Sequence, residues 1–168
     1  MTDIRDETPD DYADVYRVNV LAFGQQGEAA LVERLRVASE YVSLVAVEDG
    51  GVVGHIFFSP VTVESEGATF EAVGLGPMAV LPEFQSRGVG SRLVRRGLEE
   101  CARRGHEVVF VVGHPEFYPR FGFTPAPSRG LTCEYPVPDE VFMVAELREG
   151  ALAGRTGLVK YRPEFAGV

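Results

Sequence analysis

The sequence contains little cysteine. Its two cysteines, Cys101 and Cys133, match no metal-ligand spacing, and a pair this sparse does not indicate a disulfide framework. We therefore expect both to be free thiols of the core, predict no metal site, and take the cytoplasm as the default location.

Long apolar runs are also missing. No stretch approaches the roughly 20 consecutive apolar residues that a membrane-spanning helix needs. The N-terminal stretch MTDIRDETPDD is acidic and polar, so it lacks the basic and apolar regions of a signal peptide. Neither a membrane span nor a secretory leader is predicted, in agreement with a cytoplasmic location.

Positive charge is scarce over the chain as a whole. The net charge of −9 argues against general binding to nucleic acid or to anionic membranes, because both depend on a cationic surface. One segment differs: residues 85–104 carry six arginines against two glutamates, a local net charge of +4. A basic segment in an acidic chain predicts a small anionic ligand bound at one place.

What is present fits one globular domain of mixed α/β class. The 168 residues, 45% of them hydrophobic, suffice for a buried core, and we expect a single domain over residues 1–168. A short strand around Ile4 precedes a helix that Thr8 can cap and Pro9 can open. A second helix is expected over residues 28–38. Three strands of an antiparallel meander are then predicted, over residues 41–48, 52–64 and 69–80.

The second half of the chain continues the alternation of helices and strands. Apolar residues at helical spacing predict a helix from about Gly90 to Gly105, and the apolar run EVVFVVG is typical of a strand buried on both faces. PEFYPRFGF is interpreted as a short, proline-interrupted helix and turn whose phenylalanines belong to the core. The proline-rich residues 125–138 are expected to form a long loop. Late strands are expected over VFMVAEL and GLVKY.

Two glycine pairs lie close together and could each hold a phosphate. The first, Gly74 and Gly76, superficially matches the dinucleotide fingerprint, which needs a helix that starts at the glycines. Pro77 and Pro82 argue against a helix there. We interpret this pair as a bend or bulge in a strand, where another group approaches closely.

The second pair, in QSRGVG at residues 85–90, has the context that an anion site needs. Glycines let the loop turn tightly so that successive backbone N–H groups converge, and the helix that follows adds its positive end. Arg87 and Arg92 supply charge. The segment is not a Walker loop, since no G-K-[ST] follows. The sequence therefore predicts a phosphate site at the start of this helix.

MAVLPEFQSRGVGSRLV resembles motif A of the GNAT N-acetyltransferases, whose signature Q/R-x-x-G-x-G/A is filled by Gln85, Gly88 and Gly90. A hydrophobic strand precedes the motif, and FYPRFGF after the next strand is similar to the family's Y-x-x-x-G-F element. The order of strands and helices matches over nearly the whole chain. Within the family, GHPEFYPRFGF and GLVKYRPEF look like the YhbS-type branch of small acetyltransferases.

The resemblance implies the fold and the ligand. The fold would be the GNAT acyl-CoA N-acyltransferase fold, a mixed sheet of about six to seven strands flanked by helices, and the cosubstrate would be acetyl-CoA. The strand at Met78–Val80 would pair with the pantetheine arm, and an N–H group of Ala79 or Val80 would face the thioester oxygen. The implied cofactor-binding residues are Met78, Ala79, Val80, Gln85, Ser86, Arg87, Gly88, Val89, Gly90 and Ser91.

The resemblance also implies that Tyr118, the first residue of the Y-x-x-x-G-F element, is the catalytic tyrosine beside the departing thiolate. Since tyrosine titrates near 10 and a thiol near 8.5, full protonation of the thiolate is uphill by about 1.5 units, roughly 2 kcal/mol. A hydrogen bond and a complete proton transfer both stay open. Pro119 follows, and we expect it to push Tyr118 away from helical angles.

The general base is left open. Many relatives carry a carboxylate several residues before the position of Met78, where this chain has Gly74. The alternatives are a water chain, a substrate that arrives as a free amine, or one of Glu71, Glu28 and His114. His55 and His106 are interpreted as a strand and a turn residue without an evident partner.

The expected reaction is direct attack of a primary amine, from an unidentified small molecule or peptide, on acetyl-CoA in a ternary complex. The alternative is a non-catalytic module of the same fold that senses acyl-CoA or acts as a scaffold. No nucleic acid partner is expected, and monomer or homodimer are the states that the family resemblance favours. The acidic composition favours a cationic amine as acceptor only weakly, since surface charge also serves solubility.

Overall fold

The computed structural model describes residues 2–168, and their contacts divide the chain into two compact units. Unit 1 contains the residues up to Ser59 together with Gly76–Glu100 and Glu164–Val168. Unit 2 contains Pro60–Leu75 and Cys101–Pro163. The nine strands of the described chain belong to one hydrogen-bonded sheet, and strands β3 (Gly51–Ser65) and β4 (Ala68–Val80) contribute to both units. The mixed α/β class is confirmed, with more strands than the six to seven expected.

Unit 1 contains the N-terminal strands and most of the helical residues. Its elements are β1 (Asp3–Asp6), the 3-10 turn η1 (Pro9–Asp11), α1 (Tyr12–Phe23), α2 (Gly27–Ala38), β2 (Val42–Glu48), the first part of β3, the end of β4, the turn η2 (Pro82–Phe84), α3 (Val89–Arg103) as far as Glu100, and the turn η6 (Pro163–Phe165) from Glu164 on. β2 is antiparallel to both β1 and β3. Asp49 and Gly50, both with positive φ, form a tight hairpin turn between β2 and β3, as the adjacent Asp-Gly residues favour.

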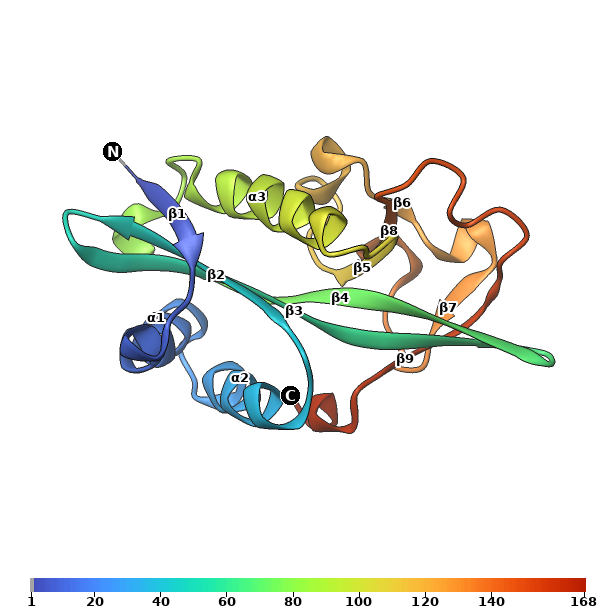
Figure 1. Ribbon diagram of the computed structural model, residues 1–168, viewed down its shortest axis with the longest axis horizontal. Helices are drawn as coiled ribbons and strands as arrows, with labels where there is room; N and C mark the ends of the chain where they lie inside the picture. The colour runs from blue at the N-terminus through green and yellow to red at the C-terminus, as the bar shows by residue number, and fades with distance from the viewer. Residues whose placement is uncertain (1) are drawn as a thin grey trace. The chain divides into compact units, whose positions relative to one another are not determined.

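The helices of unit 1 cover the two faces of its strands. Figure 1 shows α1 and α2 on one side of β2 and β3, with α3 on the other side. α3 lies very close to β3, because a Cβ atom at Gly97 would stand 2.5 Å from the ring of Phe58. At the start of α1, the Asp11 carboxylate accepts hydrogen bonds from the N–H (2.8 Å) and the hydroxyl (3.2 Å) of Thr8.

Unit 2 is built on the other parts of β3 and β4 and on the C-terminal strands. Its further elements are β5 (Val108–Val112), η3 (Tyr118–Phe121), β6 (Thr124–Pro125), η4 (Pro127–Arg129), β7 (Leu131–Cys133), η5 (Asp139–Val141), β8 (Phe142–Glu146) and β9 (Gly157–Tyr161). β5 is parallel to β4 and antiparallel to β8, while β9 is antiparallel to β3 and parallel to β7. β8 also pairs with β6.

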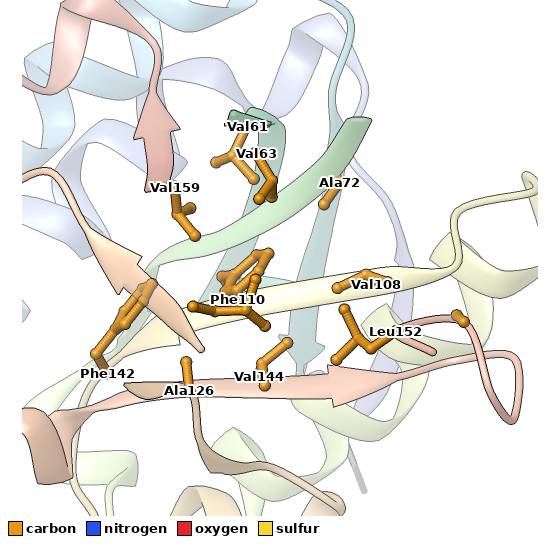
Figure 2. Close-up of a cluster of buried hydrophobic side chains, with 12 residues drawn as sticks. Val61, Val63, Ala72, Val108, Phe110, Ala126, Phe142, Val144, Leu152 and Val159 are labelled. Carbon is orange, nitrogen blue, oxygen red and sulfur yellow. The ribbon is translucent and has the colours of Figure 1, made fainter. Parts of the chain in front are cut away.

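The core of unit 2 is a cluster of buried aliphatic and aromatic side chains (Figure 2). Within this cluster, the rings of Phe110 and Phe142 stack with their centroids 5.6 Å apart. Of the phenylalanines expected in the core, Phe123 is buried, whereas Phe117 and Phe121 are half-buried. Cys101 and Cys133 are free thiols, the first buried and the second half-buried.

The proline-rich residues 125–138 depart from the predicted loop. They contain η4 and the strand β7, which pairs with β9. The pairing partner lies more than twenty residues away in the chain, so the sequence pattern of a three-residue strand between prolines gives little sign of it. None of the helices within residues 2–168 is both long and apolar enough to cross a bilayer.

Candidate functional site

The end of β4 pairs with β3 along one edge and has unpaired backbone groups along the other. The Leu81 N–H, just after β4, donates to the Val53 carbonyl of β3 at 2.9 Å, so the backbone groups of Ala79, two residues earlier, also face β3. Because strand residues alternate, the N–H and C=O groups of Met78 and Val80 face away from β3. The pairing of β5 with β4 covers Val73–Leu75 and stops before Met78.

A short turn then folds the chain back onto the strand. After η2, the side-chain amide of Gln85 donates to the carbonyl oxygen of Val80 at 3.0 Å. Ser86 (φ 63°) and Gly88 (φ 83°) both take left-handed backbone conformations, which is unusual for serine. Gln85 therefore holds the loop in place through its side chain, a role that its position in the motif does not reveal.

The loop presents a row of backbone donors at the start of α3. The first helical bond runs from the Arg92 N–H to the Gly88 carbonyl, at 3.1 Å. Within the described chain, the N–H groups of residues 86–91 donate to no protein acceptor. Unpaired N–H groups at a helix start, together with the positive end of the helix dipole, form a binding site for an anion.

Two arginines beside this loop are available for a ligand. Arg92 is exposed, and the Arg87 guanidinium lies 5.3 Å from the ring centroid of Phe84. Neither makes an ion pair with a carboxylate among residues 2–168. Arg96, one turn further along α3, instead donates to the Ile4 carbonyl at 3.4 Å.

The structure brings the predicted coenzyme residues together in unit 1, on β4, the loop and the first turn of α3. Val89 differs from the others, because its side chain is buried against Gly54 of β3. A Cβ atom added at Gly54 would stand only 3.2 Å from a methyl group of Val89. Its side chain therefore belongs to the core, and only its backbone can reach a ligand. That these residues bind a coenzyme stays a prediction.

Tyr118 belongs to unit 2 and lies in an aromatic setting. Its ring makes edge-to-face contacts with Phe117 and Phe123, with centroids 5.0 and 5.6 Å away, and only 6% of the residue is exposed. Burial raises the pKa of Tyr118 to about 12. η3 begins at Tyr118, so the expectation that Pro119 keeps this residue out of a helical turn is wrong.

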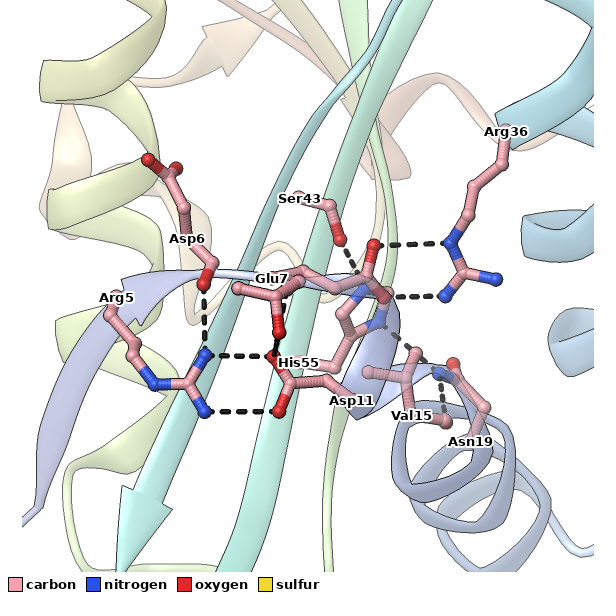
Figure 3. A network of polar contacts seen from close by, with 10 residues as sticks. Arg5, Asp6, Glu7, Asp11, Val15, Asn19, Arg36, Ser43 and His55 are labelled. Carbon is pink, nitrogen blue, oxygen red and sulfur yellow. Dashed lines mark hydrogen bonds and ion pairs between the residues drawn. The ribbon is translucent and has the colours of Figure 1, made fainter.

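His55 is the residue whose setting the sequence reasoning missed. It is fully buried on β3, its Nδ1 lies 3.2 Å from Asn19 Nδ2, and its Nε2 lies 2.9 Å from Ser43 Oγ (Figure 3). Asn19 also donates to the Val15 carbonyl at 2.9 Å, so its amide is the donor toward His55. The neutral ring accepts at Nδ1 and donates at Nε2. Burial, and the nearby charge of Arg36, lower its pKa to about 3.

An ion pair lies beside this histidine. The guanidinium of Arg36 donates to both carboxylate oxygens of Glu7, and the two side chains are 8% and 1% exposed. Arg36 also stacks over the ring of Tyr12 at 3.9 Å. No group of three or more His, Cys, Asp or Glu residues in the described part of the chain is arranged to hold a metal ion. The cluster fixes α1 and α2 to the strands.

Comparison with known proteins assigns the family. A family model described as an acetyltransferase (GNAT) domain matches residues 3–126. The chain belongs to the GNAT acetyltransferases. The uncharacterized N-acetyltransferase YjhQ of Escherichia coli K12 is 42% identical over 134 residues, 77% of this chain and 74% of YjhQ. YhbS of the same organism is 37% identical over 164 residues, 96% of this chain and 97% of YhbS.

Solved GNAT structures agree with this assignment. The Escherichia coli YhbS structure, in complex with CoA, superimposes with a TM-score of 0.91 and 36% identity, over 98% of this chain and 91% of that one. A Brucella melitensis GNAT acetyltransferase in complex with acetyl-CoA has a TM-score of 0.81 and 34% identity, over 98% of each chain. The predicted family, its YhbS-like branch, the acyltransferase class and the fold are confirmed.

The general base of this GNAT chain stays open. Glu28 is half-buried on α2, where both of its carboxylate oxygens accept from the Gln25 amide at 3.0 and 3.2 Å. Glu71 on β4 and His114 after β5 are exposed. The carbonyl oxygen of His114 accepts from the Phe117 N–H at 3.1 Å, so this residue caps its turn through its backbone.

Proposed function

We propose that the protein is an N-acetyltransferase that transfers the acetyl group of acetyl-CoA to a primary amine of a small molecule or peptide, in a ternary complex. The observation that carries the proposal is the row of unpaired N–H groups over residues 86–91, flanked by Arg87 and Arg92. Relatives of 34–36% identity crystallised with CoA or acetyl-CoA support the choice of ligand.

The diphosphate of the coenzyme is the part that fits the loop. It carries two negative charges, accepts several hydrogen bonds, and would take the donors of the loop and of the first turn of α3. The pantetheine arm would continue along β4, where Met78 and Val80 turn their backbone groups away from β3. Gln85 holds the two segments together by its bond to Val80.

Acetyl transfer itself needs few protein groups. The amine nitrogen attacks the thioester carbonyl carbon, the N–C bond forms, the C–S bond breaks, and CoA leaves as a thiolate while the amine loses a proton. Of the two expected donors, the N–H group of Val80 faces away from β3 and would stabilise the carbonyl oxygen, whereas the N–H group of Ala79 faces β3. Direct attack removes the need for a covalent enzyme intermediate.

Tyr118 serves best as a hydrogen-bond donor to the departing sulfur. With its pKa raised to about 12, transfer of its proton to a thiolate of pKa near 8.5 is uphill by about 3.5 units, roughly 5 kcal/mol. A hydrogen bond that strengthens as charge develops on sulfur avoids this barrier. The buried position of the ring favours this role over complete proton donation.

The test combines coenzyme binding with turnover. Titration calorimetry should detect CoA binding to the wild-type protein, and thiol release from acetyl-CoA should appear with some members of a panel of amines. Tyr118→Phe removes one hydrogen bond to the charged sulfur, so it should lower kcat by about 10- to 100-fold and leave CoA affinity unchanged. Absence of heat with CoA contradicts the proposal. Tight CoA binding without thiol release for any amine supports the sensor or scaffold alternative.

Several finer properties remain predictions of the same proposal. These are a single domain over residues 1–168, a cytoplasmic location, and a monomer or homodimer without nucleic acid or membrane partners. Size-exclusion chromatography with light scattering tests the oligomeric state, and cell fractionation tests the location.

A further inference from the structure

Tyr161 lies against β4 at a place where the strand has no side chain. A Cβ atom at Gly74 would stand 2.8 Å from Cε2 of Tyr161 and 3.1 Å from a methyl group of Val61. Any larger residue at position 74 would therefore displace the ring. Gly74 precedes Met78 by four residues on the same strand.

Two residues of the segment after β7, Glu134 and Tyr135, lie next to Tyr161. The Glu134 carboxylate accepts a hydrogen bond from the Tyr161 N–H at 2.6 Å, and the Glu134 N–H donates to the Val159 carbonyl at 3.1 Å. The rings of Tyr135 and Tyr161 lie 6.3 Å apart at an angle of 38°. Glu134 is exposed, and both tyrosine residues are half-buried although the hydroxyl oxygen of Tyr161 is itself buried. The carboxylate is therefore open to solvent beside two partly exposed tyrosine residues.

The charge at this place is negative and uncompensated. Three other glutamates of unit 2 have a basic partner: Glu64 pairs with Lys160, Glu107 with Arg148 and Glu146 with Arg129. Glu134 pairs with no basic side chain in residues 2–168. Its charge contributes to raising the pKa values of Cys133, Tyr135 and Tyr161, although burial is the largest cause in each.

We propose that Glu134, with the rings of Tyr135 and Tyr161, binds the ammonium group of an alkylamine acceptor. This inference rests on the proposed function and adds the substrate class to it. A carboxylate oxygen supplies an opposite charge and a hydrogen-bond acceptor, and aromatic faces attract cations within about 6 Å of the ring centroid. The ordered carboxylate and the rigid rings need little rearrangement to receive such a group.

The proposal distinguishes amines by their charge. An alkylamine is protonated at pH 7, whereas an arylamine such as aniline is neutral, so only the alkylamine gains from a carboxylate and aromatic faces. A diamine such as 1,4-diaminobutane offers Glu134 one ammonium group and carries a second nitrogen as a candidate for acetylation. Glu134 is therefore a binding residue for the acceptor, and the identity of the general base is a separate question.

The experiment compares Glu134→Gln with a matched control. The glutamine keeps the acceptor for the Tyr161 N–H and removes only the charge, so the fold should persist. Glu140→Gln removes an exposed charge from η5 in the same segment. Binding of 1,4-diaminobutane to the CoA-loaded protein is measured by calorimetry, and acetylation of 1,4-diaminobutane and of aniline by thiol release.

Glu134→Gln should weaken diaminobutane binding about tenfold or more and raise the KM for diaminobutane by a similar factor. The KM for acetyl-CoA and the turnover of aniline should stay unchanged. Glu140→Gln should behave as wild type. Tyr135→Leu, which removes one ring, should weaken diaminobutane binding several-fold.

Equal binding by wild type and Glu134→Gln, or no diaminobutane binding by the wild type, overturns this proposal. Thiol release with other amines would then still support the acetyltransferase function. Diaminobutane binding that depends on Glu134, without any acetyl transfer, contradicts the acetyltransferase function instead.

Discussion

The polar cluster around His55 and the loop at the start of α3 both belong to unit 1, yet they use their hydrogen-bonding groups in opposite ways. In the cluster, both ring nitrogens of His55 have partners, and the ion pair between Glu7 and Arg36 is largely buried. In the loop, consecutive N–H groups over residues 86–91 have no acceptor within the described residues. The cluster stabilises the fold, and the loop keeps its donors for a ligand.

The largest expected effect on stability comes from breaking the buried ion pair. Glu7→Ala leaves the Arg36 guanidinium without its partner in a site that is 8% exposed, which should cost about 3–5 kcal/mol of unfolding free energy. Urea denaturation measures the loss. The double variant Glu7→Leu with Arg36→Leu should recover much of the stability, since it removes both charges. A loss below about 1 kcal/mol in the single variant would mean that water solvates Arg36.

A second effect concerns the pH dependence of stability. The folded protein holds the pKa of His55 at about 3, below the ordinary value of 6.5, so the unfolded chain binds an additional proton below pH 6.5. Stability should therefore fall as the pH falls from 6.5 toward 3, by about 2 kcal/mol between pH 6.5 and 5. Urea midpoints at pH 5, 6, 7 and 8 test this slope.

The control for the histidine is a substitution that cannot titrate. His55→Gln should flatten the slope between pH 6.5 and 5, even if its overall stability is lower. His106→Gln, in the turn after α3, should keep the wild-type slope, because His55 is still present. An unchanged slope in His55→Gln would assign the pH dependence to other groups.

In the loop, Gly88→Ala should act on both stability and ligand binding. The left-handed conformation at φ 83° costs a residue with a Cβ atom about 1–2 kcal/mol, although the side-chain space is open. A shift of the loop would also misalign its donors, so CoA affinity should fall about tenfold or more in calorimetry. Gly24→Ala, with φ 71° and open space at the end of α1, is the matched control. It should lose similar stability and keep CoA affinity.

The smallest effect on stability is expected for Arg92→Ala. Arg92 is exposed and makes no described contact, so unfolding free energy should change by less than about 0.5 kcal/mol. CoA affinity should fall about fivefold at low salt and by less at high salt, because the lost attraction to phosphate is screened. Arg17→Ala on α1 should leave CoA affinity unchanged. A salt-independent loss for Arg92→Ala would contradict a direct charge contact.

Local sequence patterns predicted the elements well where neighbours in the chain decide the structure. The turn at Asp49 and Gly50, the helix α3 and the buried strand β5 agree with their patterns of glycine and apolar residues. The strand β7 was missed, because its three residues form a strand by pairing with β9. Tyr118 opens a helical turn despite Pro119, since the preference of a residue before proline is weaker than the packing of its ring.

The candidate coenzyme loop could be recognised from spacing, because an anion site at a helix start needs only glycines, a basic residue and the helix that follows. The hydrogen bond by which the Gln85 side chain holds the loop to the Val80 carbonyl could be seen only in the tertiary structure. The same holds for Glu134 and Tyr161, which lie 27 residues apart in the chain and are joined by a hydrogen bond from the Tyr161 N–H to the Glu134 carboxylate. A contact between distant residues leaves no local periodicity to detect.

The amino-acid sequence by itself determined the order of the elements, the family and the loop that offers its backbone donors, since these depend on propensities and spacings within short segments. Tertiary structure alone decided which charges are buried, which histidine is held neutral, and which carboxylate lies uncompensated beside two tyrosines. Burial and pairing are set by residues that approach from different strands and helices, and they fix the pKa and the availability of each group.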